Sequence, residues 1–204
     1  MDLEERWLDF CRHLGLEGTD QWLVLKSGYS EPERAYHNLG HIADCLAQLD
    51  ALALPEPEAT ALEAAIWFHD LVYDTRAKDN EERSAEAALS FLRPTTMAAE
   101  VAELIRATKH HNPAETGFAI ILCDIDLSIL GRDPQSYAGY AKAIRKEYGW
   151  VSDEDYASGR TAVLRNFLDR DHIFATSEFR IRYEQQARAN LQGELDVLAR
   201  KGEG

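Results

Sequence analysis

Apolar residues recur at spacings of three and four along nearly the whole chain, and this periodicity is that of helices rather than strands. In the first helical stretch, one face carries Leu3, Trp7, Phe10 and Leu14. The pattern predicts helices over residues 3–14, 36–53, 57–72, 80–94, 95–108, 117–130, 133–148, 152–168 and 177–199. A chain of 204 residues can bury one sizeable core, so we expect a single all-α domain over residues 1–204, an irregular helical bundle.

Residues 117–130 form the most apolar part of the chain and the one stretch with an ambiguous pattern. The string IILCDIDLSIL partly alternates, as a strand would, but its length and the Gly131 that follows favour a buried helix. Polar residues mark where other helices begin: Asn80 as an N-cap, Thr95 or Thr96, and Asp133 before Pro134.

The chain is acidic, with 36 acidic and 22 basic residues and a formal net charge of −14. This balance argues against a nucleic-acid interface and an anionic membrane surface, because both need a basic face. No apolar run reaches the roughly 18–20 residues of a membrane helix. The acidic, amphipathic start MDLEERWLDF is unlike a secretory signal. Three widely spaced cysteines in apolar strings predict buried free thiols and a cytoplasmic location.

Histidine and aspartate side chains gather in or beside the apolar helices. His37 and His41 are four residues apart, so a helix would place them on one face. Other residues of this kind are His69 and Asp70 after the string AAIWF, His110 and His111 at the end of a predicted helix, and Asp124 and Asp126 within IILCDIDLSIL.

A charged aspartate in an apolar helix is costly unless it is paired or bound to a metal ion. A divalent cation would satisfy both the buried aspartates and the neighbouring histidines, and imidazole with carboxylate suits manganese, iron, cobalt, nickel or zinc. The alternatives stay open at this point. Each aspartate could cap a helix or face solvent, and the two histidines of YHNLGH could form a structural pair.

The order H…HD…D on a helical chain resembles the HD superfamily of metal-dependent phosphohydrolases. The string YHNLGHIADCL at 36–46 is similar to the signature of the cyclic-nucleotide phosphodiesterases, a branch of that superfamily. HDLVYDT at 69–75 resembles the alarmone hydrolases, with Tyr73 where they have a glutamate. The whole layout is most similar to small, uncharacterised HD phosphohydrolases. These motifs cover residues 34–131, and the C-terminal helices at about 133–200 match only in helical character.

The resemblance implies that His41, His69 and Asp70 are metal ligands, with one or two divalent ions (Mn, Fe, Co, Ni, Mg or Zn) per chain. It favours Asp126 as the fourth ligand, because Leu127 and Ser128 follow it as in the phosphodiesterases. Asp124 would then orient a histidine or a water molecule, although helical geometry alone allows either aspartate to be the ligand.

The remaining candidates each have two interpretations. His37 is the general acid of the phosphodiesterase-like reading, or it satisfies backbone groups near a helix start. Asp74 positions the attacking water or caps the following turn. His110 and His111 bind a second metal ion or the phosphate, or they favour the C-terminal end of the helix dipole. Arg83 and Lys109 bind the substrate phosphate or face solvent.

These residues together predict a metal-dependent phosphohydrolase that acts through activated water on a small phosphate ester, with a nucleotide as the expected substrate. Two alternatives use the same fold: a binuclear iron oxygenase with His110 and His111 as further ligands, and a non-catalytic nucleotide-binding protein. A homodimer is compatible with an acidic helical chain of this size.

Overall fold

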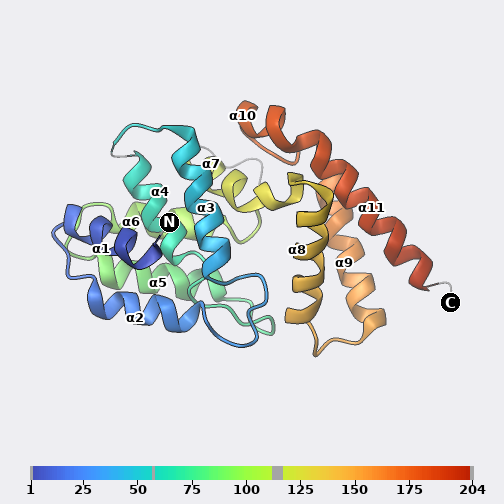
Figure 1. Ribbon diagram of the computed structural model, residues 1–204, viewed down its shortest axis with the longest axis horizontal. Coiled ribbons are helices and arrows are strands. Elements are labelled where there is room, and N and C mark those ends of the chain that lie inside the picture. Colours follow the sequence, from blue (N-terminus) through green and yellow to red (C-terminus); the bar gives the residue numbers. More distant parts are fainter. Residues whose placement is uncertain (1, 57, 112–116, 203–204) are drawn as a thin grey trace. The chain divides into compact units, whose positions relative to one another are not determined.

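The computed structural model describes residues 2–56, 58–111 and 117–202, and every regular element in these ranges is helical, as the periodicity predicts (Figure 1). The chain falls into two compact units, residues 1–122 and 123–204. Each unit is described by itself, and the single domain expected from the sequence stays a prediction. No helix of the described part is long and apolar enough to cross a membrane.

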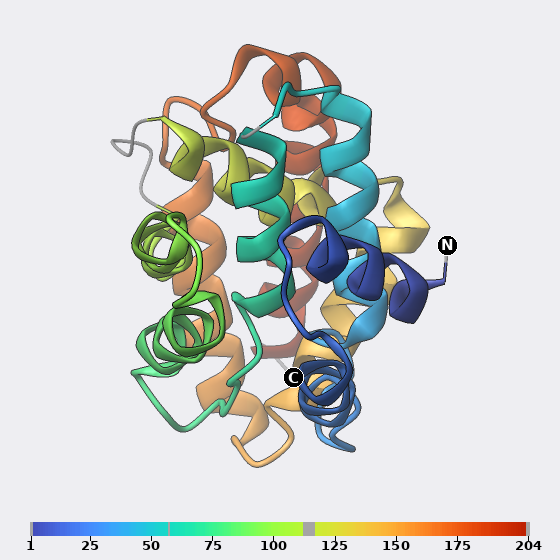
Figure 2. The ribbon, with the colours of Figure 1, turned by 90° about the vertical axis from the view of Figure 1, so that its left-hand side faces the viewer.

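The first unit is built around one helix that is buried on nearly all sides. Its elements are α1 (Leu3–His13), α2 (Thr19–Gly28), α3 (Leu39–Leu52), α4 (Glu58–Phe68), α5 (Asn80–Leu92), α6 (Ala98–Ala107) and the start of α7 (Phe118–Asp126). Helix α4 packs against α3, α5 and α6, and Figure 2 shows it between α3 on one side and α5 with α6 on the other. Its apolar string AAIWF is therefore central to the core.

Aromatic rings fill the space where α1, α2 and α4 meet. Trp7 of α1 meets Trp67 of α4 edge to face, with ring centroids 5.5 Å apart, and Trp22 of α2 meets the same ring at 6.3 Å. Edge-to-face pairs of this kind contribute about 0.5–1.5 kcal/mol beyond their area burial. The end of α4, from which His69 and Asp70 follow, is thus anchored in a rigid core.

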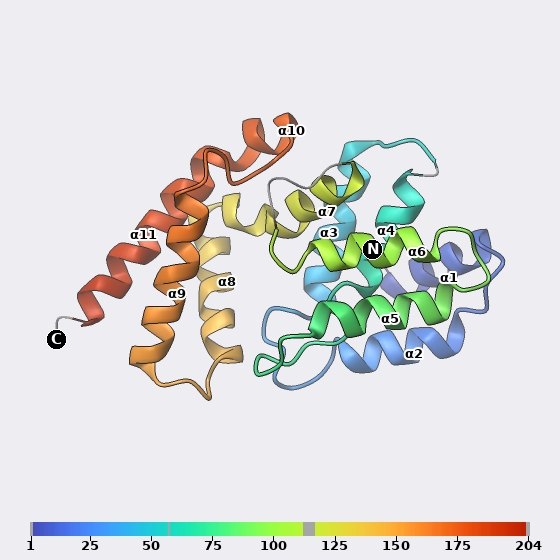
Figure 3. The ribbon, with the colours of Figure 1, turned by 180° about the vertical axis from the view of Figure 1, so that it is seen from behind.

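The second unit contains a short 3-10 turn after α7, η1 (Leu127–Gly131), then α8 (Pro134–Glu147), α9 (Asp153–Leu168), α10 (Ser177–Phe179), a π-helical segment η2 (Arg180–Glu184) and α11 (Gln185–Gly202). Helices α9 and α11 pack side by side (Figure 3). A part-buried ion pair joins them, because Arg160 Nε donates to Glu194 Oε1 at 2.8 Å.

Several helix boundaries agree with the sequence and others do not. Asp133 caps α8 by accepting from Gln135 N at 3.0 Å and Ser136 N at 3.1 Å, as predicted. By contrast, α6 begins at Ala98 without a threonine cap, and the Thr95 hydroxyl instead donates to the Leu92 carbonyl at 2.8 Å. The predicted helix 117–130 ends at residue 126 and tightens into η1, while the expected start at residue 57 lies outside the described residues.

Helix α2 was not predicted, and its pattern of burial gives the reason. Only Trp22 and Leu25 are buried on it, while the apolar Leu23 and Val24 are exposed. The apolar residues therefore do not mark one face. The cysteines behave as expected, since all three are free and buried.

Gly131, at the end of η1, offers a test of packing in the second unit. A Cβ added there would lie 2.7 Å from the Tyr183 carbonyl oxygen, a clash with backbone that a side-chain movement cannot relieve. We expect Gly131→Ala to lower the free energy of unfolding by about 1–3 kcal/mol. Gly159, within α9, has nothing within 4 Å of the same position, so Gly159→Ala is the matched control.

The control substitution should raise the free energy of unfolding by about 0.5–1 kcal/mol, because alanine favours the helix. Urea denaturation of the two variants, followed by circular dichroism, measures both effects. Equal stability of the two variants would contradict the close packing of Gly131 against the Tyr183 backbone.

Candidate metal centre

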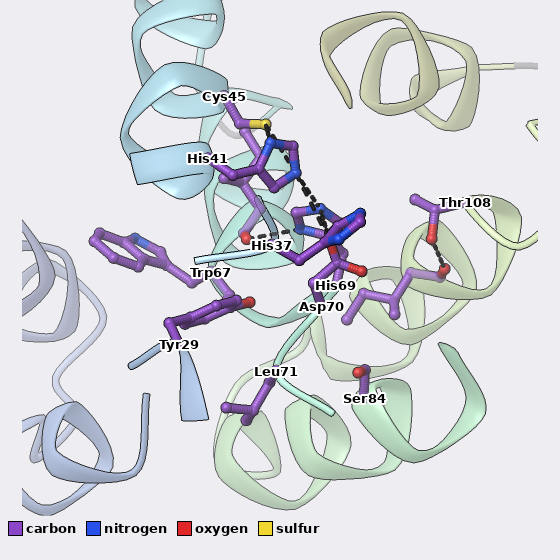
Figure 4. A network of polar contacts seen from close by, with 12 residues as sticks. Tyr29, His37, His41, Cys45, Trp67, His69, Asp70, Leu71, Ser84 and Thr108 are labelled. Carbon is purple, nitrogen blue, oxygen red and sulfur yellow. Dashed lines mark hydrogen bonds and ion pairs between the residues drawn. The ribbon is translucent and has the colours of Figure 1, made fainter. Parts of the chain in front are cut away.

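Two buried histidines approach each other at the start of α3 and the end of α4. His41 is the third residue of α3, whose N-cap Asn38 accepts from Gly40 N at 2.8 Å. His69 directly follows α4 and extends its hydrogen bonding, since His69 N donates to the Ala65 carbonyl at 2.9 Å. The two Nε2 atoms are 3.2 Å apart, and the dashed lines of Figure 4 mark this contact. Neither histidine exceeds 3% exposure.

The hydrogen bond at the far side of His69 settles which of its nitrogens faces the site. Nδ1 lies 3.0 Å from the Ile66 carbonyl oxygen, which can only accept, so Nδ1 carries the proton. Nε2 then points toward His41 and, when the ring is neutral, carries the lone pair. A backbone carbonyl that holds a histidine in this way is the usual support of a metal-binding imidazole.

Asp70 adds a third atom to the same place. Its Oδ2 lies 3.1 Å from His69 Nε2 and 3.6 Å from His41 Nε2. Ligand bonds of about 2.0–2.2 Å at angles of roughly 90–120° separate ligand atoms by about 2.8–3.8 Å. All three observed separations fall in this interval. Atoms this close to one another share a proton or a bound metal ion, so these three side chains could hold a metal ion.

A further candidate carboxylate is that of Asp126, the last residue of α7. Asp126 belongs to the second unit, so its part in the ligand set stays a prediction. No thiolate belongs to the group. Cys45, one turn after His41, is buried with its Sγ 3.7 Å from His41 Nε2.

Asp124 has a different role from the one expected. Its two carboxylate oxygens accept from Ala175 N at 2.8 Å and Thr176 N at 2.7 Å, so it anchors the loop before α10. Burial raises the pKa of Asp124, and the hydrogen bonds from Thr176 and Ala175 partly oppose that shift. The expectation that Asp124 orients a histidine or a water molecule is replaced by this backbone contact.

His37 lies outside helix α3, so the prediction that it shares a helix face with His41 is wrong. Asn38 takes the N-cap with an extended backbone (φ −126°, ψ −175°), and the helix begins only after it. The His37 ring nevertheless stays close to the site, with its centroid 5.8 Å from that of His41. It stacks on Tyr73 at a centroid distance of 4.2 Å.

The structure gives Asp74 a place in a turn. Its Oδ1 accepts from Arg76 N at 2.9 Å, and the side chain is exposed. The Asn80 amide bonds to both the N–H and the carbonyl of Asp74, at 3.1 and 2.9 Å. Asn80 is thus the first residue of α5 rather than its cap, and it holds the preceding loop.

The candidate phosphate ligands do not join the metal group. Arg83 is exposed on α5. The Lys109 ammonium donates to the Lys78 carbonyl at 2.7 Å and so ties the turn after α6 to the loop before α5. His110 is exposed and His111 adopts a left-handed backbone with φ 42°. Across residues 2–56, 58–111 and 117–202, no second group of three metal-binding side chains is found.

Two buried residues near the site were not singled out from the sequence. Arg34 is 6% exposed, although arginines are rarely buried, and its guanidinium donates to the carbonyls of Asp70 and Leu71. Tyr29 donates its hydroxyl to the Trp67 carbonyl at 3.0 Å. Burial raises the pKa of Tyr29 well above its usual value, and the negative charge of Asp70 adds to this shift. A buried arginine has no periodic signal that could reveal it.

Comparisons of the chain with protein-family models, curated proteins and solved structures find no match. The function of the site is therefore argued from its own geometry.

Proposed function

We propose that this protein is a metal-dependent phosphohydrolase, similar to the HD superfamily, that hydrolyses a small phosphate ester. The observation that carries the proposal is the convergence of His41 Nε2, His69 Nε2 and Asp70 Oδ2 within 3.1–3.6 Å of one another. The order of these residues supports it, since they occur in the chain as H…HD. We assign Asp126 as the fourth ligand on the motif resemblance, because Leu127 and Ser128 follow it.

The ligand set favours a metal ion of borderline character. Two imidazoles and two carboxylates suit Mn, Fe, Co, Ni or Zn, whereas Mg prefers carboxylate and water oxygens. A divalent ion bound there would lower the pKa of a water molecule and polarise a phosphoryl oxygen. The two carboxylates, Asp70 and Asp126, offset its charge, which makes an anionic ester compatible with an acidic chain.

We assign His37 as the general acid. A leaving alkoxide needs a proton, and a positioned imidazole contributes about 10²–10⁴-fold to such a step. The His37 ring lies beside His41 and is held by the stack on Tyr73, so its orientation is restricted. The ring lies in the loop before α3, next to a proposed ligand, where a substrate bound to the metal ion would come near it.

The positions of the described residues fit a phosphohydrolase better than an iron oxygenase. The oxygenase requires His110 and His111 as ligands of a second metal ion, and neither belongs to the ligand group. A non-catalytic nucleotide-binding protein would have no need of three converging ligand atoms. A nucleotide remains the proposed substrate, on the strength of the motif resemblance alone.

Removal of the Asp70 carboxylate tests the proposed activity. We expect Asp70→Ala to reduce the turnover of p-nitrophenyl phosphate with Mn or Co by at least about 100-fold, because a metal ligand is lost. Asp44 is exposed on α3, three residues after His41, so Asp44→Ala removes the same charge without touching the site. It should retain wild-type turnover. The proposal would be contradicted if Asp70→Ala kept the wild-type rate while its circular dichroism spectrum still showed the helical fold.

The role of His37 predicts a dependence on the leaving group. His37→Asn should slow the hydrolysis of an alkyl phosphate by about 10²–10⁴-fold. It should hardly affect p-nitrophenyl phosphate, whose phenolate leaves without a proton. Steady-state kcat values for the two esters measure the difference, and His13→Asn on α1, an exposed histidine, is the control. An equal loss for both esters would contradict the acid role.

A further inference from the structure

Arg34 carries a buried positive charge in the loop between α2 and α3. Its side chain is only 2% exposed. Burying a charged group is costly unless hydrogen bonds and opposite charge compensate. The bonds that Arg34 makes therefore identify what its charge stabilises.

The guanidinium forms a fork on the turn that carries two of the metal ligands. Arg34 Nη1 donates to the Asp70 carbonyl at 2.5 Å, and Nη2 donates to the Leu71 carbonyl at 2.7 Å. These two successive carbonyls directly follow His69. Because the guanidinium is planar, the two bonds together restrict the orientation of that turn more than a single bond would.

The same guanidinium also reaches the loop that leads into α3. Nη1 lies 3.4 Å from the His37 carbonyl oxygen, at the limit of hydrogen bonding. Arg34 is three residues before His37 and seven before His41. One side chain thus connects the segment that carries His37 and leads to His41 with the segment that carries His69 and Asp70.

Two tyrosines hold the guanidinium in place. Its Cζ lies 5.3 Å from the ring centroid of Tyr29 and 5.5 Å from that of Tyr73. Tyr29 is itself bonded to the carbonyl of Trp67 at the end of α4, and Tyr73 stacks on His37. The position of Arg34 is thereby coupled to both segments through rigid rings as well as through hydrogen bonds.

We propose that Arg34 is a positioning residue that brings the His69–Asp70 turn and the His41 helix start to metal-binding distance. This inference rests on the metal site of the proposed function. The remaining bond of Arg34, from Nε to Glu31 Oε2 at 2.9 Å, goes to a side chain that is 51% exposed. An ion pair this exposed contributes little to stability. The two hydrogen bonds to the Asp70 and Leu71 carbonyls, rather than the ion pair with Glu31, position the ligands. A lysine ammonium cannot form both bonds in the same planar geometry.

A titration with Co²⁺, whose visible absorption reports the coordination geometry, tests the proposal without relying on activity. Arg34→Lys should weaken Co²⁺ affinity by about 10- to 100-fold, the range seen when groups that support metal ligands are lost. It should also alter the Co²⁺ spectrum. Arg34→Ala should show the same loss, and added methylguanidine should restore part of the affinity. Glu31→Gln should bind Co²⁺ as the wild type does.

Arg6→Lys is the control for a merely structural role. Arg6 of α1 bonds to Glu63 at 2.8 Å and to Asp50 at 2.7 Å in the same unit, but to neither ligand segment in these bonds. This variant should lower the thermal midpoint and keep the Co²⁺ affinity and spectrum. Wild-type affinity and spectrum in Arg34→Lys would overturn the positioning role alone. A wild-type chain that binds no Co²⁺ would overturn both this role and the proposed function.

Discussion

Two nitrogens of buried imidazoles and an oxygen of a partly exposed carboxylate face one another in the first unit, separated by 3.1–3.6 Å. Such an arrangement is unfavourable without a cation, because lone pairs and a negative charge meet where little water can screen them. Nδ1 of His69 donates to the Ile66 carbonyl, which turns Nε2 toward the other two atoms. The close approach of these three atoms is the constraint on which the rest of the site depends.

The scaffold meets this demand by joining rigid elements to short loops. Helix α4 is buried on nearly all sides and delivers His69 and Asp70 at its end, while the start of α3 delivers His41. The loops between them contain polar groups that the helices cannot satisfy. Tyr29 takes the carbonyl of Trp67, and Arg34 takes those of the two residues after His69. The polar surroundings of the ligands are thus largely backbone carbonyls bonded by buried side chains.

Periodicity was sufficient to predict the helical fold. It placed His41, His69 and Asp70 in or beside apolar helices together with several other candidates, and only the resemblance to the HD superfamily singled them out as ligands. Periodicity misplaced His37, because the four-residue spacing cannot show that Asn38 would start the helix. It could not separate Asp124 from Asp126, as both have apolar neighbours on α7. The contact that distinguishes Asp124 comes from backbone N–H groups 51 and 52 residues further along the chain. The role of Arg34 could not be predicted from the sequence, because its partners are backbone carbonyls, which every residue has.

The central claim is that one divalent ion binds at the junction of α3 and the end of α4. Diffraction from crystals grown with Mn²⁺, measured for the anomalous signal of the metal, tests it most directly. The account predicts one strong anomalous peak at about 2.0–2.3 Å from His41 Nε2, His69 Nε2 and a carboxylate oxygen of Asp70. A map with no peak among these atoms, or with its peak at His110 and His111, would contradict it.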